Sequence, residues 1–137
     1  MALRIPESKV DKKMHVIQND KNIIQVFLHG KLNQNSLFDA QKDLMLHPEY
    51  AHKNSLWHFD KDFVCDFSNA GMADLISRIK LFYPTDATKQ KAALLATSSM
   101  HYAILQLFCD DAEIEGLPFR FRAFQSHEKA DAWLNEF

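Results

Sequence analysis

Apolar segments of strand length and of helix length alternate along the second half of the chain. Ala92–Ala96 is a short apolar run without alternation, which is typical of a central strand buried on both faces. In Phe119–Phe124, apolar residues alternate with Arg120 and Arg122, a pattern that predicts an edge strand with one solvated face. Strands of both kinds, separated by helical segments, indicate a sheet with helices packed on it.

The first half predicts a hairpin, a helix and a third strand. Met14–Gln18 and Ile23–His29 are β-branched and aromatic runs on either side of Asn19–Asn22, a turn-rich tetrad. A helical stripe follows over about residues 35–46. Ser55–Phe59 is the third predicted strand. The stripe consists of Leu37, Phe38, Ala40, Gln41, Leu44 and Met45.

Three further helices are predicted in the second half. The cleanest helical period in the chain begins after Ser68, a predicted N-cap. Thr97–Ser99 caps a helix that ends near Asp110–Asp111, and Ser126 caps the last helix. The apolar faces of the three helices are Met72, Leu75, Ile76, Ile79, Phe82 and Tyr83; Met100, Ala103, Ile104, Leu107 and Phe108; and Ala130, Trp133, Leu134 and Phe137.

These elements predict a single α/β domain that covers residues 1–137. Their order is ββαβαβαβα, and a hairpin that leads into right-handed βαβ crossovers gives a mixed sheet of about five strands with about four helices. We expect one sheet to contain four segments, with Trp133 packed against it or against a neighbouring helix. The segments are Ile23–Leu28, Leu56–Phe59, Ala92–Ala96 and Phe119–Phe124.

Composition narrows the partners and the compartment. The formal net charge of −2 argues against a nucleic-acid partner, which needs a basic surface. Nothing approaches the ~18 consecutive apolar residues of a membrane span, and the N-terminus lacks the apolar run of a signal peptide. We therefore expect a cytoplasmic protein in which Cys65 and Cys109 are buried thiols. The Phe119–Arg122 segment, as an edge strand, predicts a monomer or a weak homodimer.

Three segments carry a resemblance to a known family. They are Leu56–Asp60, the Ala92–Ala96 strand with the following Ser98–Tyr102, and Phe124–Leu134, which contains Phe-x-Ser-x-Glu-x-Ala-x-x-Trp-Leu. The stretch from Ser55 to Leu134 resembles the SpoIIAA-like proteins, which are STAS relatives, and especially their STAS-like bacterial branch. The resemblance implies a SpoIIAA-like sandwich and a protein that binds or regulates a partner.

The resemblance also draws attention to the turn after the third strand. In STAS antagonists, a kinase phosphorylates the serine directly before a glycine at a helix start, where free N–H groups favour a phosphate. Alignment on Gly71 keeps Met72 in the helical stripe and puts Ala70 in the acceptor position. Alignment on Asp66 puts Ser68 there but requires a two-residue insertion. We therefore predict that Ser68 is an N-cap, and a phosphorylation-switched anti-sigma-factor antagonist that uses Ser68 is the disfavoured alternative.

No catalytic, cofactor or metal constellation stands out in the sequence. His29 and His58 lie on predicted strands and would converge if those strands were neighbours, but zinc takes three or four protein ligands. Ser98 and Ser99 lie two or three residues from His101 at a helix start and point in other directions, so we interpret them as capping residues rather than nucleophiles. We predict no cofactor and no metal, and an enzyme of unrecognised type is the third and last of the functional hypotheses.

Aromatic residues make up 12% of the chain, and four of them, Tyr50, Phe63, Phe67 and Tyr83, fall near loops around the turn after the third strand. We predict a non-enzymatic binding or regulatory module that contacts a protein partner through the surface around residues 63–72. The alternative is a carrier of a small apolar ligand or lipid, by analogy with the CRAL-TRIO proteins. The candidate surface consists of Phe63, Asp66, Phe67, Ser68, Asn69, Gly71 and Met72.

Overall fold

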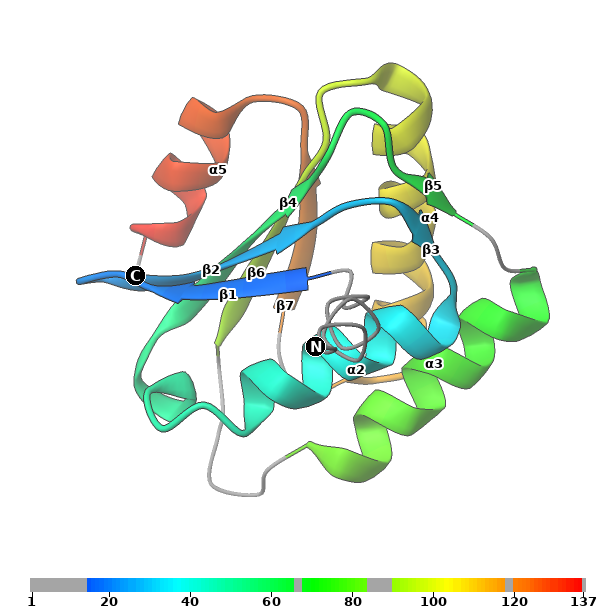
Figure 1. Cartoon of the computed structure of the whole chain (residues 1–137), viewed down its shortest axis with the longest axis horizontal. Helices are drawn as coiled ribbons and strands as arrows, with labels where there is room; N and C mark the ends of the chain where they lie inside the picture. The colour runs from blue at the N-terminus through cyan, green and yellow to red at the C-terminus, as the bar shows by residue number, and fades with distance from the viewer. Residues whose placement is uncertain (1–14, 66–67, 84–89, 118–119, 137) are drawn as a thin grey trace, which may run out of the picture.

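A five-stranded mixed sheet with helices on both faces forms the frame of the protein (Figure 1). The computed structural model describes residues 15–65, 68–83, 90–117 and 120–136. The α/β class, the mixed sheet and four α-helices within those residues are as predicted. In chain order the elements are β1 (His15–Asn19), β2 (Ile23–Leu28), β3 (Lys31–Leu32), α2 (Gln34–Met45), η1 (Tyr50–His52), β4 (Asn54–Phe59), β5 (Val64–Cys65), α3 (Asn69–Phe82), β6 (Lys91–Leu95), α4 (Ser99–Ile114), β7 (Arg120–Phe124) and α5 (His127–Leu134).

The strands of the main sheet lie in the order β1-β2-β4-β6-β7. β1 pairs with β2 in antiparallel fashion, as the predicted hairpin requires, and the other pairs are parallel. The four segments expected to share a sheet therefore do so, except that Phe119 lies outside the described residues. β7 is an edge strand, as its alternating pattern predicts. The two-residue strands β3 and β5 form a second, small sheet that is too short to leave a periodic signal.

Each face of the main sheet has its own core. On one face, which we call the three-helix face, α2, α3 and α4 cover inward side chains such as Val26, Trp57 and Leu94. On the opposite face, which we call the α5 face, α5 covers Leu56 and Leu95. Figure 1 shows α5 on one side of the sheet and α2 and α3 on the other. β6 is buried along its whole length, and its sequence from Ala92 to Leu95 is accordingly a continuous apolar run.

α5 is fixed to the sheet at its C-terminal end. Trp133 is 7% exposed, and its ring lies 5.6 Å from the ring of Phe124, so the prediction that Trp133 packs against the sheet is confirmed. Lys91, at the start of β6, is buried, and its Nζ donates to the backbone oxygens of Trp133 at 2.8 Å and Glu136 at 2.6 Å. A cation is favourable at this end of a helix because the last carbonyls lack intrahelical partners.

α4 differs from its prediction in length and in orientation. It continues past Asp110–Asp111 to Ile114, because charged residues on an exposed turn do not stop a helix, and the chain leaves it at Gly116, with φ of 75°. Its buried residues are Leu105 and Ala112. Met100 and Leu107, assigned to the apolar face by periodicity, are exposed instead. Apolar residues surround much of this helix, so the period alone does not identify the side that packs.

Candidate functional site

The turn at residues 63–72, where the sequence predicts a partner surface, is partly closed by its own side chains. Phe63 is 1% exposed, and its ring lies 4.1 Å from that of His101 at the start of α4. Val64, in β5, is exposed. Asp66 and Phe67 lie outside the described residues. Phe63 therefore anchors the turn to α4 and offers almost no area to a partner.

Ser68 is the N-cap of α3, as predicted. Its Oγ accepts a hydrogen bond from the backbone N–H of Gly71 at 3.2 Å. Asn69 is the first residue of the helix, and Ala70 is exposed. Gly71 and Met72 are buried. The described surface of this turn thus comprises the apolar side chain of Val64 and the small residues Ser68 and Ala70, while Met72 is buried.

The aromatic residues assigned to this turn separate into two groups. Tyr50 and Tyr83 contact each other edge to face, with ring centroids 6.2 Å apart. Tyr83 follows the last residue of α3, whereas Phe63 precedes its first residue. A helix of 14 residues is about 21 Å long, so the tyrosines and Phe63 cannot belong to one site.

Behind the turn, an apolar cleft lies on the three-helix face. Met72 belongs to it, which links the cleft to the region that the sequence singled out. The cleft has a volume of about 40 Å³, which is room for roughly three water molecules. Leu37, Ile104 and Phe108 are half-buried, so the cleft reaches solvent beside them. The lining residues are Leu37, Gln41, Trp57, Phe59, Met72, Leu75, Ile79, Leu94, Ile104, Leu105, Phe108 and Phe121.

Gln41 is the exception in this apolar lining. The side chain comes from α2 and is 2% exposed, yet its Nε2 has no hydrogen-bond partner among the described residues. The Tyr50 hydroxyl is also buried without a partner of normal geometry, and the Gln41 side chain lies close enough to lower the pKa of that phenol by a hydrogen bond of poor geometry. A buried N–H group without a well-formed hydrogen bond costs up to about 1–3 kcal/mol, so this amide is a candidate contact for a ligand that enters the cleft.

The polar groups next to Gln41 are tied to the protein. The Tyr83 hydroxyl donates to Oε1 of Gln90 at 2.8 Å, and Nε2 of Gln90 donates to the backbone oxygens of Tyr50 at 3.3 Å and Ala51 at 3.0 Å. Burial raises the pKa of Tyr50 above its usual range, so this phenol is neutral at physiological pH. The Gln41 amide therefore sits beside a rigid, uncharged hydrogen-bonding group.

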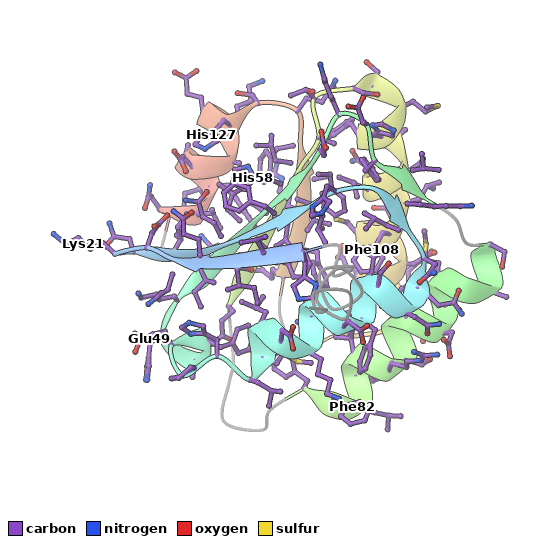
Figure 2. All side chains as sticks on the ribbon, in the orientation of Figure 1. Lys21, Glu49, His58, Phe82, Phe108 and His127 are labelled. Atoms are coloured by element: carbon purple, nitrogen blue, oxygen red, sulfur yellow. The ribbon has the colours of Figure 1, made fainter. Side chains whose placement is uncertain are left out.

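A second group of polar side chains lies on the α5 face. The ring of His58 in β4 stacks on Phe27 with centroids 4.4 Å apart, and its Nε2 lies 2.6 Å from Oε1 of Gln25. His127 lies at the start of α5, and the centroid of its ring is 5.9 Å from that of His58. Its Nδ1 is 3.5 Å from Oδ2 of Asp131. Figure 2 labels both histidines. Burial is the main cause that lowers the pKa of His58, and the charge of the nearby His127 lowers it further.

The remaining candidates of the sequence have structural positions. Phe27, not His29, pairs with His58 across the strands, and His29 is exposed. Within the described ranges, no three histidine, cysteine or carboxylate side chains are grouped to hold a metal ion. Ser98 caps α4 by accepting from the N–H of His101 at 3.3 Å. Cys109 is a free thiol, and burial raises its pKa to about 12.

Comparisons with known proteins identified no relative from which a family or a function could be inferred. No protein-family model matches the chain, and no curated protein matches its sequence. Among the helices that the structure describes, none combines the length and the apolar character needed to cross a membrane.

Proposed function

We propose that the protein is a non-enzymatic binding module of the SpoIIAA-like type, and that it holds the apolar group of a small ligand in the cleft between the sheet and α2, α3 and α4. The observation that carries the proposal is the unpartnered Nε2 of Gln41 in a lining that is otherwise apolar. Binding pockets commonly combine an apolar wall with a few polar groups that orient the ligand. The ligand therefore carries a hydrogen-bond acceptor next to its apolar group.

The size of the cleft restricts the ligand further. Space of about 40 Å³ accepts a short alkyl group but not a whole lipid chain. A longer chain enters only if the half-buried side chains of Leu37, Ile104 and Phe108 change rotamer. The cleft therefore holds the carbonyl or carboxylate group and roughly the two or three nearest carbons of a short aliphatic ligand, and the rest of the ligand extends toward solvent beside those side chains.

A protein partner at the surface around residues 63–72 is the second candidate. The exposed side chain of Val64 favours it, because an exposed β-branched residue beside a helix start offers apolar area to a partner. In this proposal Ser68 acts as a helix cap and is not a phosphorylation switch, since its Oγ is engaged with Gly71. The two candidates differ in one respect: a carrier retains a small molecule through purification and a partner-binding module does not.

Native mass spectrometry of protein purified from its own cells tests the first candidate directly. We expect a bound small molecule, released on denaturation. Independently, methyl butyl ketone, which combines a short chain with a carbonyl acceptor, should bind the ligand-free protein and change the fluorescence of Trp57 in a Trp133→Phe background. Trp57 lines the cleft, whereas Trp133 lies on the α5 face.

A pair of matched variants separates binding from stability. Leu105→Phe fills the cleft, and Leu56→Phe adds the same volume to the core of the α5 face. Leu56→Phe should cost about 1–3 kcal/mol of stability by overpacking, and Leu105→Phe should cost less because its added atoms enter open space. Only Leu105→Phe should abolish ketone binding. Equal ketone binding by both variants, or no ketone binding by the wild type at millimolar concentration, contradicts the cleft proposal and leaves the partner surface.

A further inference from the structure

The outward side of α4 carries an apolar stripe that nothing in the described chain covers. Met100, Leu107 and Ile114 are 66%, 60% and 79% exposed and follow one another at intervals of seven residues. Seven residues are two helical turns, so the three side chains lie in one line along the helix. Ala103 lies between the first two and is also exposed. An exposed line of large apolar residues on a helix is unusual for a surface that faces only water.

The stripe is symmetric about Leu107. Met100 lies seven residues before it and Ile114 seven residues after it, so a second copy of α4 in antiparallel orientation would place Met100 against Ile114 of the other copy. Leu107 would then meet its own counterpart on the two-fold axis. Symmetric homodimers use interfaces in which the same patch contacts itself, and this spacing has that property.

Charges beside the stripe match the same arrangement. The C-terminal half of α4 carries the exposed acids Asp110 and Glu113, and its last turn contains no basic residue. Acidic groups at this end of a helix are unfavourable because the free carbonyls are also negative. Next to the N-terminal half of α4, the exposed side chains of Arg122 and Lys129 lie around the groove shared with Tyr102. An antiparallel pair of α4 helices places the acidic half of each copy beside the basic groups of the other.

We propose that the protein forms a homodimer through α4, with the two helices antiparallel and Leu107 on the two-fold axis. The contact is small, since one helix pair and its flanks bury less than the ~1,600 Å² of a standard interface. The dimer is therefore weak and forms in the micromolar range. It does not use the backbone of the edge strand β7, the place where the sequence suggested that copies of this chain could pair.

Sedimentation equilibrium of the wild type over a concentration series tests the dimer. We expect a reversible monomer–dimer equilibrium that high salt weakens, because opposite charges flank the stripe. Leu107→Lys should weaken association by about tenfold or more, as a charge at the centre of an interface is poorly tolerated. Leu81→Lys is the matched control, since Leu81 is 82% exposed on α3, outside the stripe. A wild type that stays monomeric, or equal losses in the two variants, refutes the proposal.

Cysteine crosslinking tests the orientation. Under mild oxidation Leu107→Cys should form a disulfide dimer by itself, because its counterpart lies directly across the axis. Met100→Cys alone and Ile114→Cys alone should not crosslink, since each lies about 21 Å along the axis from its own counterpart. A mixture of these two variants should crosslink. Crosslinking of Met100→Cys with itself indicates a parallel pair, and crosslinking of Leu81→Cys at the rate of Leu107→Cys indicates random collision; either result refutes the antiparallel dimer.

Discussion

Replacement of Gln41 by Leu should stabilise the free protein, which is the opposite of what a substitution at a buried position usually does. Gln41 is 2% exposed and its Nε2 has no partner in the described structure, so the wild type bears a desolvation cost of about 1–3 kcal/mol. Leu is similar to Gln in size and in helix propensity. Its side chain has one heavy atom fewer, and the loss of that atom's contacts costs about 0.8 kcal/mol at most. We therefore expect a net gain of about 1 kcal/mol, or roughly 3 °C in Tm.

Urea unfolding followed by circular dichroism measures this gain. Gln34→Leu is the matched control on the same helix, because the Gln34 amide donates to Asp74 at 3.3 Å and its removal should bring no gain. In the same variants, methyl butyl ketone should bind Gln41→Leu more weakly than the wild type. A loss of stability in Gln41→Leu larger than about 0.5 kcal/mol means that the amide has a partner inside the protein, and it refutes the reasoning from an unpaired donor.

Three further predictions concern the frame and the turn. Trp133→Ala should lower the free energy of unfolding by about 3–5 kcal/mol, since the ring is buried against Phe124, and a loss below about 1 kcal/mol in urea unfolding contradicts this packing. Ser68→Ala should cost ~1 kcal/mol through the lost cap, measured in the same way, and phosphate found on Ser68 in protein from its own cells would restore the switch. The pKa of His58 in the folded state lies below its ordinary value of 6.5, so as the pH falls the imidazole is protonated in the unfolded chain before it is protonated in the folded protein. Neutral His58 therefore favours the folded state above about pH 6.5, and this part of the free energy of unfolding is lost as the pH falls below that value. His58→Gln should flatten the fall in unfolding free energy between about pH 7 and 5, and an unchanged slope contradicts the assignment.

The strands of the main sheet and three of the helix starts could be predicted from the sequence, because each depends on neighbouring residues. Side-chain caps at Ser68, Ser98 and Ser126 mark three helix starts within one residue, and the all-apolar β6 differs visibly from the alternating β7. The spatial order of the strands was not predicted, because right-handed crossovers fix the hand of each connection and not which strands are neighbours. Local pattern was therefore sufficient to predict the strands of the main sheet but not their order or the small β3–β5 sheet.

The cleft could not be predicted in the same way because it depends on distances between helices. Its lining comes from α2, α3, α4 and three strands of the sheet, and side chains such as Leu37 and Phe108 are more than 70 residues apart in sequence. One signal was present: Gln41 is the polar member of an otherwise apolar helical stripe. A polar residue at a core position has either a partner inside the protein or a ligand, and only the structure distinguishes these outcomes.

The two proposals use opposite sides of α4 and can therefore be tested independently. Leu105 and Leu107 are two residues apart, and at 100° per residue their side chains point about 200° apart around the helix. Leu105 accordingly lines the cleft at 4% exposure, whereas Leu107 is 60% exposed on the outer stripe. Leu105→Phe should remove ligand binding and keep the dimer, and Leu107→Lys should do the reverse. If either substitution removed both properties, the cleft and the interface would be coupled through the position of α4, or through β7, where Phe121 lines the cleft and Arg122 flanks the interface.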